Sequence, residues 1–143
     1  ESVRWETHDI LPPVDQRFDE DAILRHISDR SQSVTNRNRP AYTVAWIRRV
    51  NAGIPITISS LHINDASMLH LPAESFVEYQ LRAQASAPDR FVACAAYGDG
   101  GPWYIPTASA YSEGGYAVSV AWCDPAIDQI LSGGIKELLT RVG

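Results

Sequence analysis

Two oxygen-bearing side chains stand where apolar segments of this chain end. Glu74 follows an apolar run that closes at Leu71-Pro72, and Tyr104 follows a glycine-rich stretch. Side chains at the ends of strands can converge on one site, and a carboxylate is an established zinc ligand. No paired histidine motif with metal-ligand spacing accompanies these two residues. Together they supply half of a metal site, and the other half must come from elsewhere.

Simpler interpretations of the same residues also stand. A carboxylate at Glu74, at the start of a predicted helix, is favoured by the helix dipole alone. A tyrosine such as Tyr104, between apolar neighbours, commonly packs its ring and bonds its hydroxyl to the backbone. His62 and His70 fall on a predicted hairpin, where cross-strand histidines can pair on a metal, although histidines without a metal are commoner. Ser75 is outside any Gly-x-Ser-x-Gly turn, so the sequence does not support it as a nucleophile.

Composition describes an ordinary globular protein. The 143 residues fit one domain, and 45% of them are hydrophobic while 20% are charged. A net charge of -5 argues against nucleic acid as a partner. No apolar run approaches the roughly 18 residues needed for a transmembrane segment, and the first residues lack the pattern of a secretion signal. Cys94 and Cys123 lack the Cys-x-x-Cys spacing of a zinc pair, so we interpret them as buried thiols in strands.

The apolar periodicity changes several times along the chain. Residues 1–17 are predicted to be irregular because Leu11-Pro12-Pro13 forbids a helix and a central strand. Residues 31–39 and 99–102 are polar or glycine-rich and are predicted to be loops. Helices are predicted at 19–29, 40–53, 74–85 and 107–111, and from 124 to Val142, with a possible kink at Gly133-Gly134. Strands are predicted at 54–63 and 66–71, as a hairpin, and at 91–97 and 116–122.

These elements predict an α/β fold, a layered mixed sheet with helices packed against it. Residues 91–97 form a nearly continuous apolar run, which is typical of a strand covered on both faces. We therefore expect this strand in the middle of the sheet, flanked by the hairpin and by 116–122. The order of the strands stays open.

Longer stretches add a family resemblance. Two runs, LHINDASMLHLPAESFVEYQLRAQ and DRFVACAAYGDGGPWYIPTASAYSEGGY, resemble the later part of the catalytic domain of the neutral, non-lysosomal ceramidases and their bacterial relatives. In that family a strand ends in Leu-Pro-Gly-Glu or a near variant, and a Tyr-Ile-x-Thr segment and two further tyrosines follow. The corresponding residues here, in the same order, are Pro72, Glu74, Tyr104, Ile105, Thr107, Tyr111 and Tyr116. The resemblance is strongest over residues 55–120.

The resemblance implies a zinc-dependent amide hydrolase acting on N-acyl lipids. It implies a zinc ion held by two histidines, a glutamate and a tyrosine, with Glu74 and Tyr104 in the last two roles. The two histidines of the family belong to an earlier region that these residues do not contain. Two oxygen ligands alone hold zinc poorly, so we expect zinc only together with the missing upstream ligands, and an inactive chain in isolation. No catalytic residue is assigned, and the substrate-binding residues are unknown.

Residues 1–143 are accordingly expected to be one domain, the C-terminal part of a larger ceramidase-like catalytic domain. Its expected partner is the missing N-terminal segment of the same protein or a second copy of the chain, as a homo-oligomer. The resemblance favours a secreted or periplasmic location. A fragment of this kind should expose an apolar patch where the missing part packs.

Departures from the family keep two alternatives open. Ala73 replaces the usual glycine before the glutamate, which suggests a less demanding backbone angle there. One alternative is a non-catalytic structural or binding module that kept the fold and binds carbohydrate or cell-surface ligands through its aromatic loop. The other is a self-contained enzyme that uses His62, His70 and Glu74 as a local metal site.

Overall fold

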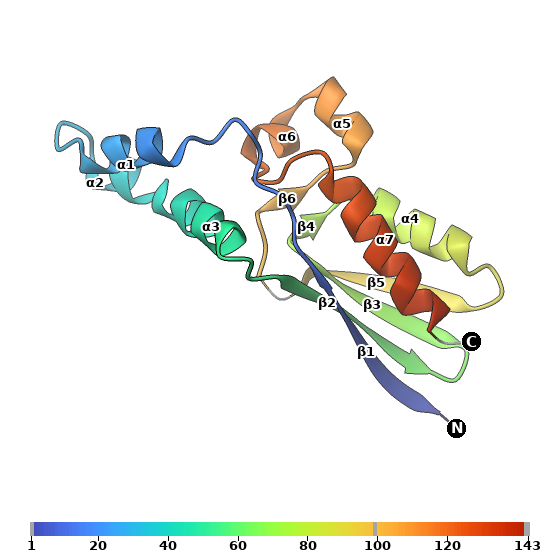
Figure 1. Cartoon of the computed structure of the whole chain (residues 1–143). Coiled ribbons are helices and arrows are strands. Elements are labelled where there is room, and N and C mark those ends of the chain that lie inside the picture. The colour runs from blue at the N-terminus through green and yellow to red at the C-terminus, as the bar shows by residue number, and fades with distance from the viewer. Residues whose placement is uncertain (1, 99, 142–143) are drawn as a thin grey trace.

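A four-stranded mixed sheet organises the molecule (Figure 1). The computed structural model describes residues 2–98 and 100–141, so Asp99 of the predicted loop and Val142 of the predicted last helix lie outside the described residues. The strands follow the order β1-β2-β3-β5, in which the pairs β1-β2 and β2-β3 are antiparallel and β3-β5 is parallel. Their bounds are Val3–Ile10, Ile56–Ile63, Ala66–Pro72 and Phe91–Gly98. The predicted layered mixed sheet and the predicted hairpin are confirmed.

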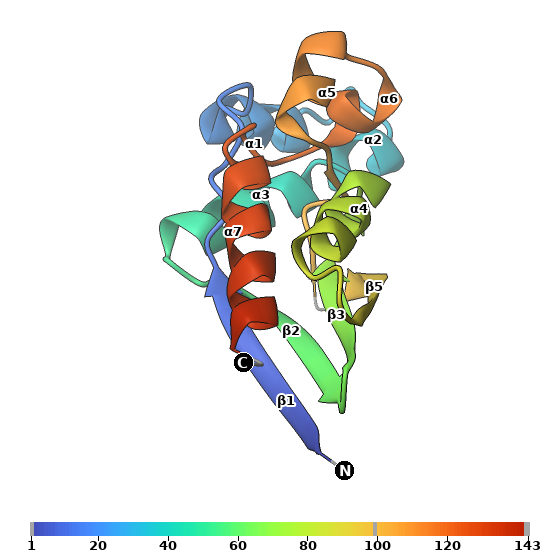
Figure 2. The same ribbon diagram turned by 90° about the vertical axis from the view of Figure 1, so that its right-hand side faces the viewer.

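Two helices, α4 (Val77–Ser86) and α7 (Ile127–Thr140), lie side by side over one face of the sheet (Figure 2). The apolar stripe of α7 is buried against this face as the sequence predicts. Its buried members include Ile127, Leu131, Ile135 and Leu138. Opposite them the sheet contributes Ile58 and Leu69, which are also fully buried. Full burial of such a side chain contributes about 1.5–3 kcal/mol, so this layer supplies the main hydrophobic stabilisation.

The close approach of α7 to the sheet depends on one glycine. A Cβ atom at Gly134 would lie 2.8 Å from Ile58 Cδ1 and 2.9 Å from His8 Cδ2. A Cβ atom at Gly133 would meet nothing within 4 Å. α7 runs through both glycines as a single helix.

Three helices gather beyond one end of the sheet (Figure 1). They are α1 (Glu20–Ser28), α2 (Val34–Asn38) and α3 (Ala41–Asn51). Asp19 caps α1, as predicted, by accepting a hydrogen bond from the Ala22 backbone N–H at 3.1 Å. α2 is a short helix inside the predicted loop 31–39, where Ser33 supplies the cap.

A second, two-stranded parallel sheet lies near the carboxyl ends of β3 and β5. It pairs β4 (Glu74–Ser75) with β6 (Tyr104–Ile105). The chain then forms two short helices, α5 (Ala108–Glu113) and α6 (Tyr116–Val120). Thr107 caps α5, as predicted, by accepting from the Ala110 backbone N–H.

Several predictions at the level of elements are wrong. The first residues are not irregular, because β1 pairs in register with β2 from Val3↔Ile63 to Ile10↔Ile56 before the prolines begin. The strand 91–97 lies at the edge of the sheet and not in its middle, and Phe91 at its start is exposed. Residues 116–120 form α6 and not a strand. Glu74 lies in β4, and the predicted helix begins only at Val77.

Both cysteines are free thiols, but the prediction of buried thiols in strands holds only in part, because Cys94 lies in a strand and is half-buried while Cys123 is buried and lies outside the named strands. Cys123 is buried and forms an isolated bridge with Val14, and burial raises the pKa of its thiol. Cys94 is half-buried in β5, where burial raises the pKa of its thiol to about 11. Among the described residues, no helix has the length and apolar character required to cross a membrane.

Candidate metal centre

Glu74 and Tyr104 are direct neighbours in the small sheet. They form a register pair of the parallel β4-β6 ladder, so the fold joins two residues that the sequence separates by an α-helix and a strand. The Glu74 backbone N–H donates to the Trp103 carbonyl at 2.8 Å, and the Phe76 N–H donates to the Ile105 carbonyl at 3.2 Å. Neighbouring strands lie about 4.8 Å apart, so the two side chains start from adjacent positions.

The Glu74 carboxylate interacts with two phenols. Hydrogen bonding to Glu74 raises the pKa of Tyr104, and partial desolvation and the charge of Glu74 add to the effect. Desolvation, followed by the charge of the same carboxylate, raises the pKa of Tyr97. Both phenols therefore keep their protons more firmly than a free tyrosine does. The carboxylate is the one side chain of the three that binds a cation without first losing a proton at neutral pH.

Tyr97 was not among the predicted site residues. It occupies the carboxyl end of β5, and its backbone N–H donates to the Ala73 carbonyl at 2.8 Å. β3 and β5 are parallel, so their carboxyl ends meet at one edge of the sheet, where α/β proteins commonly bind ligands. One feature of the sequence could have indicated Tyr97 as a site residue: it is a tyrosine that ends an apolar run and precedes several glycines.

Tyr116 adds a third aromatic ring. Its ring meets the Tyr104 ring edge-on at a centroid distance of 5.9 Å. This contact holds the Tyr104 ring from the side of α6, at the start of which Tyr116 lies.

The backbone around Glu74 is strained. Ala73, Tyr97 and Trp103 have φ angles of 56°, 62° and 63°, in the left-handed region that non-glycine residues rarely adopt. In the described part of the chain only Asn64, in the hairpin turn, shares this property among the non-glycine residues. Strain of this kind costs about 1–3 kcal/mol per residue and gathers at functional sites.

The expectation of a less demanding backbone angle at Ala73 is wrong. The alanine that replaces the family's glycine does not relax the backbone, because it keeps the left-handed angle that favours glycine. Its methyl group is buried, and a Cβ atom at Gly101 would lie 2.6 Å from it. The glycine at position 101 is thus required for the loop to pass over Ala73.

A shallow depression of about 430 Å³ opens beside Glu74. It is lined by Ala73, Glu74, Tyr97, Gly98, Gly100, Gly101 and Trp103. Trp103 also borders a larger groove of about 580 Å³ between α6 and the helices α1–α3. In that groove the Trp103 ring meets Trp122 edge-on at 5.9 Å, and the Arg39 guanidinium lies 6.0 Å from the Trp103 ring centre.

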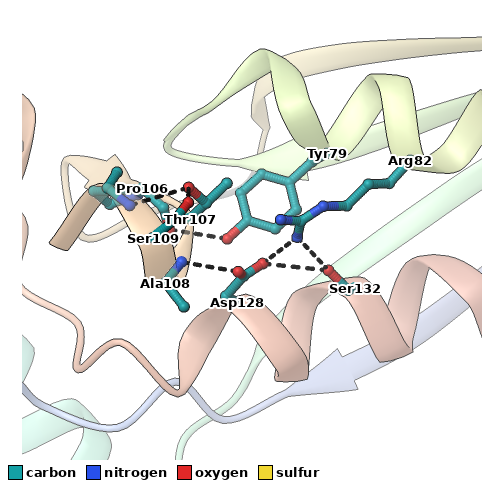
Figure 3. Close-up of polar contacts among 9 residues, drawn as sticks. Tyr79, Arg82, Pro106, Thr107, Ala108, Ser109, Asp128 and Ser132 are labelled. Atoms are coloured by element: carbon teal, nitrogen blue, oxygen red, sulfur yellow. Dashed lines mark hydrogen bonds and ion pairs between the residues drawn. The ribbon is translucent and has the colours of Figure 1, made fainter. Parts of the chain in front are cut away.

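A polar network fixes the segment that follows Tyr104 (Figure 3). The buried Asp128 carboxylate of α7 accepts from the Ala108 backbone N–H at 2.8 Å and also binds Arg82 of α4. The Tyr79 hydroxyl donates to the Pro106 carbonyl at 3.0 Å. α4 and α7 thereby hold residues 106–108, and through them the end of β6 on which Tyr104 lies.

Asp128 remains charged in this network. Burial opposes the charged form, but hydrogen bonds from Arg82 and from the Ala108 N–H outweigh burial and lower the pKa of Asp128. The ion pair is therefore a fixed structural element at neutral pH.

His62 and His70 do not form the local metal site that the alternative of a self-contained enzyme required. Both ring nitrogens of the buried His62 lie within hydrogen-bond distance of serine hydroxyls, Nε2 at 2.7 Å from Ser60 Oγ and Nδ1 at 2.8 Å from Ser67 Oγ. The strand partner of His62 is Ser67, and that of His70 is Ser59, so the two histidines lie on opposite faces of the sheet. Desolvation lowers the pKa of His62, which favours the neutral ring.

The donor set around Glu74 fits half of a zinc site. Zinc takes four ligands in its usual protein sites, and Glu74 and Tyr104 offer two oxygen donors. Residues 2–98 and 100–141 bring no three histidine, cysteine, aspartate or glutamate side chains together as a metal-binding group.

Comparisons with known proteins agree with this fold. No family model and no curated protein matches the chain. A solved neutral ceramidase from Pseudomonas aeruginosa is similar over 99% of this chain and 29% of its own, with a TM-score of 0.56 and 15% sequence identity. A ceramidase complexed with C2 is similar over 61% of this chain and 15% of its own, with a TM-score of 0.50 and 21% identity.

These likenesses show that the chain shares the fold of part of these ceramidase structures. The chain spans less than a third of the length of either ceramidase structure. The expected relation to the ceramidases is therefore supported at the level of fold, and the activity is a matter for proposal.

Proposed function

We propose that this chain supplies the glutamate and tyrosine ligands, Glu74 and Tyr104, to the zinc site of a ceramidase-like amide hydrolase acting on N-acyl lipids. The histidine ligands come from a segment outside these residues, and the chain alone is inactive. The observation that carries the proposal is the register pairing of Glu74 with Tyr104, the first residues of the parallel strands β4 and β6, which follow β3 and β5 along the chain. The ceramidase-like fold supports the substrate class, and with it a secreted or periplasmic location.

The chain's own residues prepare the site in three ways. The left-handed backbone at Ala73 and Trp103 sets the ends of β4 and β6 beside each other. The Asp128 network and the Tyr116 ring hold Tyr104 from behind and from the side. The Glu74 carboxylate lies beside the Tyr104 phenol and raises its pKa, so a bound cation would have to supply the charge that lets the phenol lose its proton.

Zinc, when bound there, would lower the pKa of a bound water to about 7 and polarise the amide carbonyl. The contribution of this chain is to keep two oxygen donors in place before the metal arrives. Preorganised donors avoid the cost of reorganisation during the reaction. The strain at Ala73, Tyr97 and Trp103 is consistent with such a preformed site.

Zinc titration by calorimetry tests the proposal on two proteins, the isolated 143-residue chain and the full-length gene product that contains it. We expect no tight site in the isolated chain and one zinc per full-length molecule. In the full-length protein, Glu74→Gln and Tyr104→Phe should each weaken zinc binding at least about tenfold and reduce amidase activity on a short-chain N-acyl sphingoid substrate. Glu113→Gln and Tyr42→Phe, both at exposed positions, serve as matched controls. Tight stoichiometric zinc in the isolated chain, or full zinc affinity in both site variants, would contradict the proposal.

A second candidate function is a non-catalytic binding module. The groove beside Trp103, with Trp122 and Arg39 against the ring, favours it because aromatic rings and a guanidinium suit sugar ligands. Oligosaccharide binding would support the binding module over the enzyme if Trp103→Ala abolishes it and Glu74→Gln leaves it unchanged.

A further inference from the structure

One face of the main sheet carries apolar side chains that no described element covers. Residues of one face alternate along each strand, and the register of the strands shows which positions share a face. We call the face opposite α4 and α7 the open face. Its residues are Val3, Trp5, Thr7, Asp9, Thr57, Ser59, Leu61, Ile63, Ala66, Met68, His70, Phe91, Ala93 and Ala95.

Large side chains on the open face are strongly exposed. The exposed fractions are 68% for Val3, 56% for Trp5, 47% for Ile63, 44% for Met68 and 69% for Phe91. The helices that pack on the sheet, α4 and α7, lie on the other face (Figure 2). An antiparallel sheet with one solvated face normally carries polar side chains there. Clustered apolar side chains on such a face indicate an interaction surface.

The charge distribution points the same way. Asp9, at one end of β1, is the one ionised side chain among the open-face residues, whereas the whole chain carries a net charge of -5. Protein interfaces are depleted of charge at their centres. The surface is thus suited to an apolar and uncharged protein layer, and not to a charged ligand.

A histidine in the middle of the open face lacks a partner. His70 Nδ1 is buried and has no hydrogen-bond partner among the described residues. The Trp5 ring lies 5.3 Å from the His70 ring and shields it. Because the atom is already covered by the chain's own residues, it does not by itself indicate a further layer.

We infer that the open face is the surface on which another layer of a longer ceramidase-like polypeptide packs. The similarity to the Pseudomonas aeruginosa ceramidase covers 99% of this chain but only 29% of the ceramidase. In that protein the shared fold is therefore one part of a much longer polypeptide. The apolar, nearly uncharged surface indicates that this layer presents mainly apolar side chains. The inference shares with the proposed function the premise of a longer chain, but it requires no metal.

Met68 provides a direct test because it is the single methionine of these 143 residues and lies on the open face. Its oxidation by dilute hydrogen peroxide, followed by peptide mass spectrometry, is compared between the isolated chain and the full-length gene product. We expect rapid oxidation in the isolated chain and at least about tenfold slower oxidation in the full-length protein, with or without a chelator. Equal rates in the two proteins, or a gene product that consists of these residues alone, would overturn the inference. Protection in the isolated chain that disappears on dilution would instead assign the face to a second copy and would also overturn it.

A pair of variants checks the surface independently. Phe91→Glu places a charge on the open face, and Tyr42→Glu places one on α3 at a similarly exposed position, 69% against 66%. In the isolated chain we expect neither variant to change the thermal midpoint by more than a few degrees. In the full-length protein Phe91→Glu should restore Met68 oxidation, and Tyr42→Glu should not. Continued protection in full-length Phe91→Glu would count against the surface, and because the readout involves no zinc, a failed zinc titration would leave this result standing.

Discussion

At the residue scale, the candidate site joins a predicted pair with a residue that sequence reasoning missed. Glu74 and Tyr104 could be selected because the family resemblance assigns them roles. Tyr97 could not, because its position depends on a left-handed angle at the end of β5, which apolar periodicity does not encode. The same holds for Ala73, whose identity suggested a relaxed backbone and whose geometry is strained.

The interaction of Glu74 with Tyr104 predicts a change in acidity. In Glu74→Gln the hydrogen bond to the carboxylate and its negative charge are both lost, so the pKa of Tyr104 should fall towards the ordinary value of 10.0. Titration of the ¹³Cζ resonances of the tyrosines by NMR measures the shift, and Glu113→Gln is the control. An unchanged Tyr104 titration in Glu74→Gln would show that the two groups do not interact in solution.

Asp128 predicts a pH dependence of stability. Its pKa in the folded state is below the ordinary value of 3.8, so the stabilisation is present above about pH 4 and is lost as pH falls through the folded-state pKa. Asp128→Asn should lower the free energy of unfolding by about 1–3 kcal/mol at pH 7 and flatten its decline in acid. Urea unfolding between pH 2.5 and 7 measures both effects, with Asp65→Asn in the exposed hairpin turn as the control. If the free energy of unfolding of Asp128→Asn fell with decreasing pH as steeply as that of the wild type, this role of Asp128 would be refuted.

At the element scale, segments with a clear local periodicity could be predicted, whereas short elements and pairings between distant segments could not. The apolar stripe of α7 and the alternating hairpin β2-β3 follow from local patterns. β1 was not predicted, because the prolines at 12 and 13 exclude regular structure only where they stand, and the strand ends before them at Ile10. The segment from Tyr116 alternates as a strand does but forms the short helix α6, because no neighbouring strand among the described residues pairs with it.

The adjacent glycines of α7 give a matched test of helix packing. Gly133→Ala should stabilise the protein by about 0.5–1 kcal/mol because alanine favours the helix and the added methyl meets no atom. Gly134→Ala should destabilise it by about 1–3 kcal/mol because the methyl would crowd Ile58 and His8. Chemical denaturation of the two variants measures the difference. Equal effects of the two substitutions would show that α7 does not approach the sheet as described.

At the scale of the whole molecule, the chain combines a buried hydrophobic layer with a candidate site at Glu74 and Tyr104 and with a sheet face that no described element covers. The core between the sheet and α4 and α7 is well buried, so the fold class could be predicted from composition and periodicity. The proposed histidine ligands and the proposed cover of the open face could not be predicted from local sequence, because both proposals place them outside these residues. The similarity to ceramidases over less than a third of their length is consistent with both.

The central claim is that Glu74 and Tyr104 bind one zinc ion. Anomalous diffraction at the zinc edge from crystals of the zinc-loaded full-length gene product tests this claim most directly. The account predicts one peak about 2.0–2.2 Å from a carboxylate oxygen of Glu74 and at bonding distance from the Tyr104 phenol oxygen, with two histidines from outside residues 1–143 completing the site. A zinc peak bound by other residues, or fully loaded crystals with no peak beside Glu74, would contradict the account.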